Sequence, residues 1–488
     1  MSQKKIISKS KIVAGEESFY NEDYESAMEY FQSAADSGEP RGLTYLSSMY
    51  EDGHGVEIDE SKTISLLHEA AELGDTEAFN RLGFLHTVGK FVPKDLHAAV
   101  EYHKVAAKQG HANSQCDLGR FYMEGLGVEK NFHEARKWYE IASKADHVEA
   151  QYGLAALLLS NGVDVLEGMK WLEKVAKSGN VNAQYELGGL KVGDRYPELK
   201  DYEGSDYWLR VASQNGSVDA IYMMANRFEH GIGISQDYKK AKEHYWEAHC
   251  LGNIEATFAL GTLYEHGLAV EKDYKTAFKF YHQAADKFHL SALFNLGRFY
   301  QFGWNVTADY SQAYRYYLLA AERGHRKCQY MVGDTLLKGY EGIPVDLNAG
   351  ANWIERAAIG GLNKAQDLIG VCYMTGNGVV QNMALAEKWF RLAVVDGDAR
   401  TQHHLAYLII RKENPKRDDY YEALKWLIFS YNKLDKEPKD EKDSLNKLIQ
   451  YDYDFIESKL SIEEFDEATK LALSDMEKSF KIEQSDMR

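Results

Sequence analysis

The chain has 488 residues, 44% of them apolar, and a formal net charge of −18 at pH 7. This excess of negative charge argues against broad nucleic-acid binding and against anchoring on anionic membranes, because both need clustered positive charge. No apolar run is long enough to span a bilayer, and the N-terminal MSQKKIISKSKIV has basic residues with no apolar segment behind them. We therefore expect a cytoplasmic protein that is neither inserted in a membrane nor exported by a cleaved signal.

Cysteine usage agrees with that expectation. Neither CxxC spacing nor a pairing that recurs along the chain is found among Cys116, Cys250, Cys328 and Cys372. This usage fits a reducing compartment. We expect all four to be small core residues rather than metal ligands.

A repeated pattern runs through most of the chain. Residues 118–144 read LGRFYMEGLGVEKNFHEARKWYEIASK, and residues 260–286 read LGTLYEHGLAVEKDYKTAFKFYHQAAD. Each unit closes on a small or turn residue, 33 to 37 residues after the last one, and a period this regular predicts one stacked solenoid. The closing residues are Gly38, Gly74, Gly110, Asp146, Gly179, Gly216, Gly252, Phe288, Gly324, Gly361 and Gly397.

Other columns keep the same register. Nine residues after each closing residue, and eleven residues before it, the side chain is always Gly, Ala, Ser or Thr. Small side chains at these points would let two helices approach closely. We expect the apolar filling to come from a bulky column: Tyr30, Leu66, Tyr102, Trp138, Trp171, Trp208, Phe280, Tyr316, Trp353 and Trp389.

Each unit is predicted to be a pair of antiparallel helices. In residues 253–288, apolar positions recur at helical spacing on both sides of a glycine-containing loop. No hairpin signal between alternating β-branched runs occurs, so we expect little or no strand. The prolines fall in expected loops or at helix starts, where they do least harm: Pro40, Pro93, Pro197, Pro344, Pro415 and Pro438.

The units are not uniform along the chain. Residues 147–179 lose part of the loop, residues 180–216 have the loop KVGDRYPELKDYEG, and residues 398–432 lack the loop glycines. Residues 1–432 are thus predicted to hold about eleven or twelve helix pairs, the last one degenerate. Residues 433–488 begin with a charged stretch and continue with apolar positions at helical spacing, which predicts a linker and a C-terminal helical cap. A detached, partner-binding tail is the alternative.

The unit pattern A-x-x-x-L-G-x-x-Y, G-x-G-V-x-x-D/N, A-x-x-W/Y and A-A-x-x-G resembles the Sel1-like repeat, a relative of the tetratricopeptide repeat. The resemblance covers roughly residues 10–432. It implies an all-α fold, a right-handed superhelical solenoid of antiparallel helix pairs in which the first helix of each pair faces a concave groove. It also implies a role as adaptor or scaffold, without catalysis. Residues 253–288 match at Ala256, Leu260, Gly261, Tyr264, Gly267, Val270, Asp273, Ala277, Tyr281, Ala284 and Ala285.

Apparent catalytic or ligand-binding motifs have simpler explanations. Four G-x-G loops lack the third glycine and the preceding strand of a nucleotide site, so we interpret them as turns: Gly53 and Gly55, Gly125 and Gly127, Gly231 and Gly233, Gly376 and Gly378. The adjacent His403 and His404 point about 100° apart on a helix and cannot easily share a metal. No apolar surroundings single out a carboxylate pair for acid–base work.

The first helices carry the candidate binding residues. One column is aromatic in six successive units and is either packing or a binding ladder: Tyr152, Tyr185, Tyr222, Phe258, Phe294 and Tyr330. One turn later the residue identity varies, as a recognition surface or an unconstrained surface would. The candidate groove residues are Arg120, Tyr222, Asn226, Phe258, Thr262, Phe294, Arg298, Tyr330, Asp334 and Tyr407.

These observations favour a non-catalytic adaptor or scaffold that binds a protein or a peptide along its concave face. We expect no cofactor, no metal and no nucleic acid. Three alternatives stay open: an immunity or inhibitor protein that neutralises a toxin, a host-directed effector, and an enzyme. The oligomeric state does not follow from the sequence.

Overall fold

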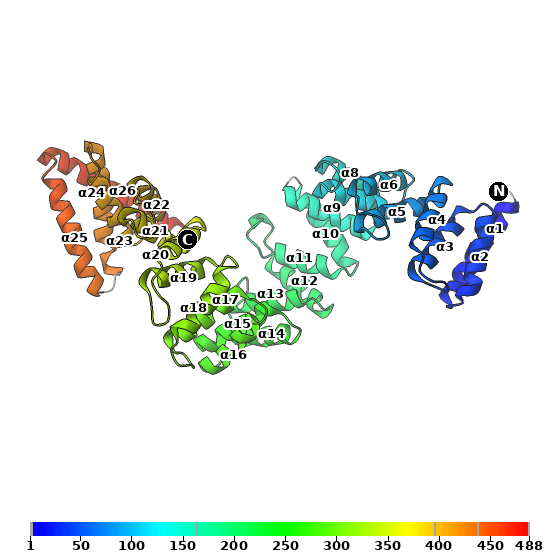
Figure 1. The fold of residues 1–488 in the computed structure, drawn as a ribbon, viewed down its shortest axis with the longest axis horizontal. Helices are drawn as coiled ribbons and strands as arrows, with labels where there is room; N and C mark the ends of the chain where they lie inside the picture. Colours follow the sequence, from blue (N-terminus) through cyan, green and yellow to red (C-terminus); the bar gives the residue numbers. More distant parts are fainter. Residues whose placement is uncertain (1–2, 163, 395–396, 437–438, 487–488) are drawn as a thin grey trace. The chain divides into compact units, whose positions relative to one another are not determined.

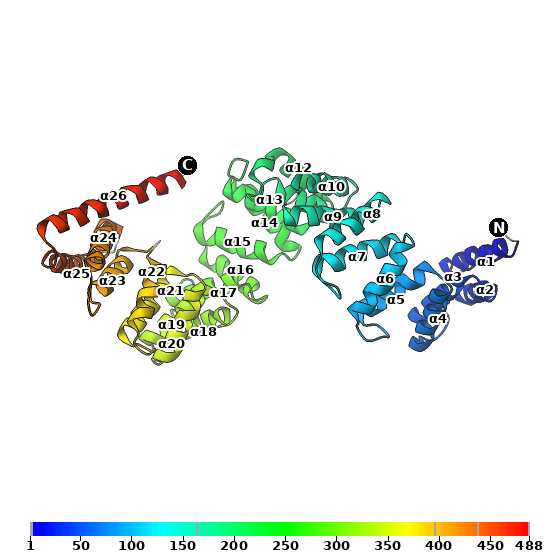
Figure 2. The ribbon, with the colours of Figure 1, turned by 90° about the horizontal axis from the view of Figure 1, so that it is seen from above.

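A computed structural model describes residues 3–162, 164–394, 397–436 and 439–486. The chain divides into two compact units, unit 1 (Met1–Gln236) and unit 2 (Asp237–Arg488). Both consist of stacked antiparallel helices (Figure 1, Figure 2). The described residues form no β-strand, and their β pairing is limited to an isolated bridge between Tyr340 and Ile343. The predicted all-α solenoid is confirmed.

The helix bounds follow the expected repeat. Unit 1 contains α1 (Gln3–Tyr20), α2 (Tyr24–Asp36), α3 (Pro40–Asp52), α4 (Glu60–Glu72), α5 (Thr76–Val88), α6 (Leu96–Lys108), α7 (Ala112–Glu124), α8 (Phe132–Lys144), α9 (Val148–Asn161), α10 (Val165–Lys177), α11 (Val181–Leu190), the 3-10 turn η1 (Pro197–Leu199), α12 (Tyr202–Gln214) and α13 (Val218–His230). Unit 2 contains α14 (Tyr238–Cys250), α15 (Ile254–His266), α16 (Tyr274–Ala285), α17 (Leu290–Phe302), α18 (Tyr310–Ala321), α19 (Arg326–Lys338), α20 (Leu347–Ile359), α21 (Asn363–Thr375), α22 (Met383–Ala393), α23 (Ala399–Ile410), α24 (Arg417–Lys433), the 3-10 turn η2 (Leu434–Lys436), α25 (Lys439–Glu457) and α26 (Ile462–Asp486). Odd-numbered helices up to α23 are the first helices of the repeats.

The turns are built as the glycine pattern predicts. All eight glycines of the G-x-G loops have positive φ, and those at positions 53, 125, 231 and 376 end a first helix in the left-handed conformation. The closing residues through Gly361 also have positive φ, including Asp146 at 56° and Phe288 at 59°. The closing position therefore requires a backbone conformation that glycine adopts without a steric penalty. Pro438 lies outside the described residues, and the other prolines lie in loops or at helix starts.

The buried filling of each pair lies one residue after the predicted bulky column. Trp138, Tyr316 and Trp389 are only half-buried, whereas the next residues, Tyr139, Tyr317 and Phe390, are 3%, 2% and 0% exposed. The most deeply buried column thus lies one position after the predicted one, although Trp208 and Phe280 of the predicted column are themselves buried, at 7% and 8% exposed. The residues that follow the predicted column point at the first helix of the same repeat, because successive helical side chains are about 100° apart.

The buried rings lie against the small column of the first helix. A Cβ atom added at Gly119 would lie 2.5 Å from Cδ1 of Tyr139, and one added at Gly261 would lie 2.6 Å from Cε1 of Tyr281. Real Cβ atoms do not approach a ring this closely, so the glycine is what allows the ring to pack there. At these positions the small column makes room for a side chain. At Gly333 it also lets a neighbouring backbone approach, because an added Cβ would lie 2.9 Å from the carbonyl oxygen of Gly350.

Most first helices from α7 onward begin with a polar cap, and the histidine caps also contact the preceding repeat. In four of them the cap is a histidine whose Nδ1 accepts a backbone N–H: His111, His147, His289 and His325. The Nε2 atoms of His111 and His289 lie 3.1 Å from carboxylates of Glu77 and Glu255, on the first helix of the preceding repeat. At the equivalent position Asn180 and Asn253 provide the cap through the side-chain oxygen.

The final helices pack on the last repeat. Leu445, Ile449 and Ile456 of α25 and Ala468 of α26 are buried in one apolar cluster with residues of α23 and α24. Ala472 of α26 is also buried, at 1% exposed. Asp452 of α25 is 2% exposed, and its carboxylate lies 3.0 Å from Nε2 of His403 and 3.1 Å from a guanidinium nitrogen of Arg411. A capping box opens α26, in which the side chains of Ser461 and Glu464 each accept a hydrogen bond from the other residue's backbone N–H.

The cysteines only partly follow the expectation. Cys328 and Cys372 are buried, but Cys116 is half-buried and Cys250 is exposed. Cys250 is the last residue of α14, and its side chain is exposed to solvent. The prediction that Cys250 is a core residue is therefore wrong.

We predict that Gly261→Leu lowers the free energy of unfolding by about 1–3 kcal/mol, because the new side chain collides with the ring of Tyr281. Urea unfolding followed by circular dichroism measures the change. Gly189→Leu is the matched control, since the nearest atom to its Cβ would be Cε of Met223 at 3.4 Å. Equal destabilisation by both variants would contradict the assigned role of the small column.

We predict that acid destabilises the repeats through buried histidines. Burial, followed by Lys327 and Arg326, holds the pKa of His325 below its usual 6.5, and burial also lowers the pKa values of His103 and His282. As the pH falls below 6.5 the unfolded chain takes up protons before the folded chain, so stability is lost from there down through the folded pKa. The melting temperature should therefore fall between pH 7 and pH 5.

His325→Asn tests the contribution of one cap. Asparagine keeps the cap bond, as Asn253 does, but does not titrate. We expect the variant to melt near the wild type at pH 7.5 and to lose less stability at pH 5. A slope of melting temperature against pH identical to that of the wild type would show that His325 does not contribute.

We predict that deleting residues 433–488 exposes the apolar side of α23 and α24 and causes aggregation or loss of the last repeat, because terminal repeats need a polar outer face. Size-exclusion chromatography and melting curves measure the effect. A monomeric truncated chain with unchanged melting would support the tail interpretation instead.

Candidate functional site

A stripe of first-helix residues in three successive repeats lines two adjoining hollows in unit 1. The stripe takes the residues three, seven and ten positions after a closing residue, which share one helix face. The hollows measure about 350 and about 570 Å³, and both are lined by Asn113 and Asp117, so they form one groove. The stripe consists of Glu77, Arg81 and Phe84 on α5, Asn113, Asp117 and Arg120 on α7, and Glu149, Gly153 and Ala156 on α9.

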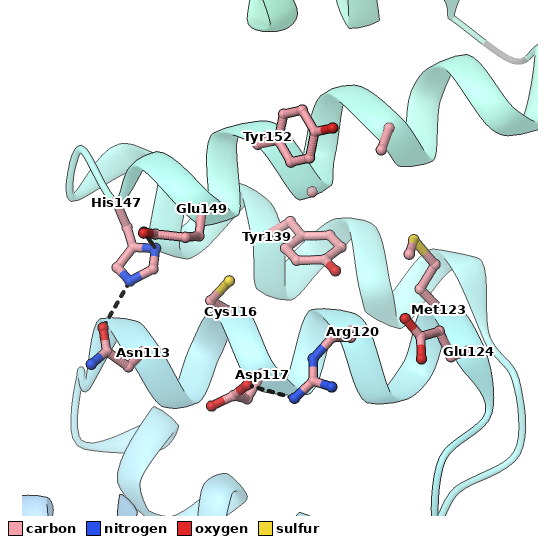
Figure 3. Close-up of a pocket in the computed structure, with 12 residues that line it drawn as sticks. Asn113, Cys116, Asp117, Arg120, Met123, Glu124, Tyr139, His147, Glu149 and Tyr152 are labelled. Carbon is pink, nitrogen blue, oxygen red and sulfur yellow. Dashed lines mark hydrogen bonds and ion pairs between the residues drawn. The ribbon is translucent and has the colours of Figure 1, made fainter. Parts of the chain in front are cut away.

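The larger hollow lies between α7 and α9, over α8 (Figure 3). The two first helices are tied near their N-termini, where Nε2 of His147 lies 2.8 Å from Oδ1 of Asn113. Tyr139 of α8 rises between them, because Gly119 and Gly153 both leave room for its ring. An added Cβ at Gly153 would lie 2.6 Å from Cε1 of Tyr139. The hollow therefore has an aromatic floor and helical walls.

The walls of the groove carry mostly negative charge. Arg120 donates a hydrogen bond to Asp117 at 3.0 Å. Lys90 donates a hydrogen bond to Glu51 at 2.9 Å, and Arg81 donates a hydrogen bond to the same carboxylate. Burial works against ionisation of Glu51, yet these two cations hold its pKa below the usual value. The groove carboxylates are Glu51, Glu77, Asp117, Glu124 and Glu149, against the guanidinium groups of Arg81 and Arg120.

Apolar and thiol groups fill the space between the charges. Phe84 is 53% exposed, and Met123, Tyr152 and Ala156 are half-buried. Burial raises the pKa of the Cys116 thiol to about 12, so this thiol is protonated at neutral pH. An exposed aromatic ring beside apolar contacts and charges is typical of protein-binding surfaces. Among the described residues, no three His, Cys, Asp or Glu side chains are arranged to hold a metal ion.

Unit 1 holds three of the ten predicted groove residues. Arg120 lines the larger hollow, where its guanidinium also lies 5.3 Å from the ring centroid of Phe121. Tyr222 and Asn226 lie on α13 and do not line either hollow of the groove. The structure thus places one predicted residue in the groove.

In unit 2, two predicted residues line separate hollows. Tyr407 lines a hollow of about 420 Å³ between α21, α23 and α25, where the guanidinium of Arg411 lies 3.8 Å from its ring centroid. Asp334 lines a hollow of about 20 Å³ and pairs with Lys338 at 2.8 Å. His403 and His404 contact different carboxylates, those of Asp452 and Asp367.

The aromatic members of the predicted set pack against neighbouring repeats. The ring of Phe258 stacks on His289 at 4.5 Å between centroids. Phe294 lies 5.6 Å from His325 and 5.9 Å from Tyr317. Tyr330 is half-buried, which raises its pKa. These contacts support the packing interpretation of the column.

Thr262 and Arg298 also make contacts within the fold. The hydroxyl of Thr262 donates to the carbonyl of Ala259 in its own helix, at 2.7 Å. Arg298 lies 3.4 Å from the buried carboxylate of Glu265, in the preceding repeat, and 4.9 Å from the ring centroid of Trp304. Partner binding by these residues stays a prediction.

Sequence reasoning missed most of the groove. Phe84 and Ala156 occupy the same column as Arg120 but were not selected, although Phe84 is aromatic and exposed. Gly153 and Tyr139 gave no signal of their own. The signal lies in comparison between repeats, since Gly153 is the only glycine found seven residues after a closing residue.

Comparison with known proteins agrees with the repeat geometry. The Sel1 repeat model matches residues 17–39, 40–75, 76–111, 112–147, 148–180, 218–252, 254–287, 290–325, 326–362 and 363–394. Helix pairs are also present at α11–α12 and α23–α24, where the model does not match. No curated protein matches the sequence significantly. None of the described helices has the length and apolar character needed to cross a lipid bilayer.

One solved structure shows the same fold over nearly the whole chain, and others are similar to parts of it. A protective antigen of uropathogenic Escherichia coli with an SLR fold is 25% identical, with a TM-score of 0.53 over 92% of this chain and 94% of that one. A Sel1 repeat protein of Oxalobacter formigenes is 24% identical over 78% of this chain and 90% of its own, with a TM-score of 0.36. An immunity protein of Pseudomonas aeruginosa is 22% identical over 43% and 81%, with a TM-score of 0.29.

The family model covers more than half of the sequence, and its boundaries coincide with the helix pairs. Repeats of this kind are typical of scaffolds for protein–protein interaction. The chain belongs to the Sel1-repeat family.

Proposed function

We propose that this protein is a non-catalytic adaptor that binds a protein or peptide partner along the first-helix stripe of unit 1. The observation that carries the proposal is the groove itself. Its two hollows lie next to each other across α5, α7 and α9 and expose apolar groups beside charged ones. A continuous surface over three repeats suits an extended segment or a helix of a partner better than a small substrate.

The charged groups favour recognition over catalysis. Arg120 and Asp117 pair with each other, and Glu77 pairs with His111, whose hydrogen bond holds the pKa of Glu77 below its usual value. Ionised groups of this kind are suited to steering and selecting a charged partner. A toxin-neutralising immunity protein and a host-directed effector are specific forms of such binding, and the identity of the partner distinguishes them.

We predict that filling the larger hollow weakens partner binding without unfolding the chain. Ala156→Trp places a large side chain at the half-buried wall of the hollow. Ala145→Trp is the matched control, because Ala145 is exposed at the end of α8 and does not line the hollow. We expect Ala156→Trp to weaken binding at least about tenfold, as loss of an interface hot spot does.

The measurement has two steps. A photo-crosslinking residue at Phe84 and, as a control, at the exposed Phe132 first identifies the partner in an extract of the native cell. The purified partner is then titrated against the wild type and the two tryptophan variants by isothermal calorimetry. Equal affinity for all three proteins, with equal melting temperatures, would show that this groove does not carry the function.

A further inference from the structure

The hydroxyl group of Tyr139 lies at the floor of the larger hollow without a hydrogen-bond partner among the described residues. Its side chain is 3% exposed and lines the hollow between α7 and α9 (Figure 3). At the equivalent position of later repeats, Tyr281 donates to Glu265 at 2.6 Å and Tyr317 donates to Gln301 at 2.7 Å. The Tyr139 hydroxyl therefore faces the hollow without a partner from the fold and is available to a group that enters the hollow.

Two departures from the repeat pattern create this situation. Met123 stands where Glu265 and Gln301 stand in the later repeats, and a thioether is a poor acceptor. Gly153 stands where Asn295 and Met331 stand, and therefore places no side chain over the ring of Tyr139. The first change removes the acceptor, and the second opens the space above the ring.

The side chains at these two positions matter to the other tyrosines. Asn295 lies near enough to the Tyr281 phenol to act on its pKa, which it lowers against the larger, opposite effects of burial and Glu265. Met331 and Tyr317 line the same hollow of about 20 Å³, compared with about 570 Å³ beside Tyr139. The absence of a side chain at Gly153 thus leaves a large hollow between two repeats, where the later repeat pair is filled by Met331.

Charge complementarity indicates what enters the hollow. Its lining carries Asp117, Glu124 and Glu149 against one cation, Arg120. Arg120 and Asp117 neutralise each other at 3.0 Å, and Glu149 lies 3.5 Å from Nδ1 of His147. Glu124 is exposed and has no ion pair among the described residues. The remaining excess is negative, so the hollow attracts a cation and repels an anion.

The surroundings of the phenol fit a lysine in particular. Met123, Tyr152 and Ala156 offer apolar surface to a four-carbon stem, and the Tyr139 oxygen offers one acceptor at the floor. An ammonium group is a compact point charge with rotatable donors, whereas a guanidinium needs a planar pair of acceptors. Burial raises the pKa of Tyr139, so the phenol stays protonated and neutral.

We infer that the hollow between α7 and α9 receives a lysine side chain of the partner, whose ammonium group hydrogen-bonds to the oxygen of Tyr139 and pairs with Glu124. This inference rests on the proposed partner binding and names the chemistry of the group that enters the groove.

The half-buried Cys116 lines the same hollow and allows a direct test. At mildly alkaline pH, the small fraction of Cys116 that is thiolate attacks cystamine, forms an aminoethyl disulfide and releases cysteamine as the thiolate, and long incubation brings the exchange to equilibrium. Bis(2-hydroxyethyl) disulfide reacts in the same way and leaves an uncharged hydroxyethyl group. The full-length protein is equilibrated with equal amounts of both reagents and traces of both thiols, and the two adducts at Cys116 are counted by peptide mass spectrometry. The exposed Cys250 provides the intrinsic ratio in the same mixture.

We expect the aminoethyl-to-hydroxyethyl ratio at Cys116 to exceed that at Cys250 about fivefold, the factor given by one net hydrogen bond or ion pair. Glu124→Gln and Tyr139→Phe should each reduce the excess, and Ala145→Trp should leave it unchanged. Equal ratios at Cys116 and Cys250, or an excess that neither variant reduces, would overturn the inference. A preference of Cys116 for the carboxylate reagent dithiodiglycolic acid would also overturn it.

Melting curves show whether the variants report on the hydroxyl alone. Tyr139→Phe should leave the melting temperature unchanged, because its hydroxyl has no partner, whereas Tyr281→Phe should lower it by stranding Glu265. A drop for Tyr139→Phe equal to that for Tyr281→Phe would show that the Tyr139 hydroxyl is already bonded in the fold and would overturn the inference. Loss of partner binding in Ala156→Trp without a cation preference at Cys116 would refute the lysine assignment alone. Retained partner binding in Ala156→Trp would refute the proposed groove itself.

Discussion

Each repeat is held together by a large side chain of its second helix that packs against a small residue of its first helix. A ring such as Tyr281 fits only because position 261 has no Cβ, and the same geometry recurs with Tyr139 at Gly119 and Phe390 at Gly370. The contact fixes the axial register of the two helices, since a shift of one residue would place a Cβ in the ring. Because this contact recurs along the chain, the first helices present the same face, and the stripe that forms the groove follows from that regularity.

The sequence was sufficient to predict the parts of the fold that recur. Period, helix pairs, turns and the small columns depend on local rules, and each was visible about ten times over. The sequence did not reveal which column is buried, because Trp138 and Tyr139 are adjacent and both aromatic. Only the direction of the side chain separates them, and a shift of about 100° reverses which one is buried.

The candidate site was much harder to predict. Arg120 was found because it is polar and varies within its column, whereas Phe84 and Ala156 are equally groove-facing and were passed over. The predicted aromatic residues Phe258 and Phe294 contact the histidine caps of the next repeat instead. A family pattern marks positions that all repeats need. A binding site depends on positions where one repeat differs from the others, and these produce no periodic signal.

The residues that open the hollow are separate from those that hold the helix pair together. Gly119 and the ring of Tyr139 form the contact that recurs between repeats, while Met123 and Gly153 only determine whether the hydroxyl has a partner and is covered. Recognition is thereby uncoupled from architecture. A solenoid of this kind can acquire a receptor for one side chain, lose it, or move it to another repeat through point substitutions, with no insertion and no new loop. Its specificity is then encoded by which repeats depart from the pattern and by the spacing between them.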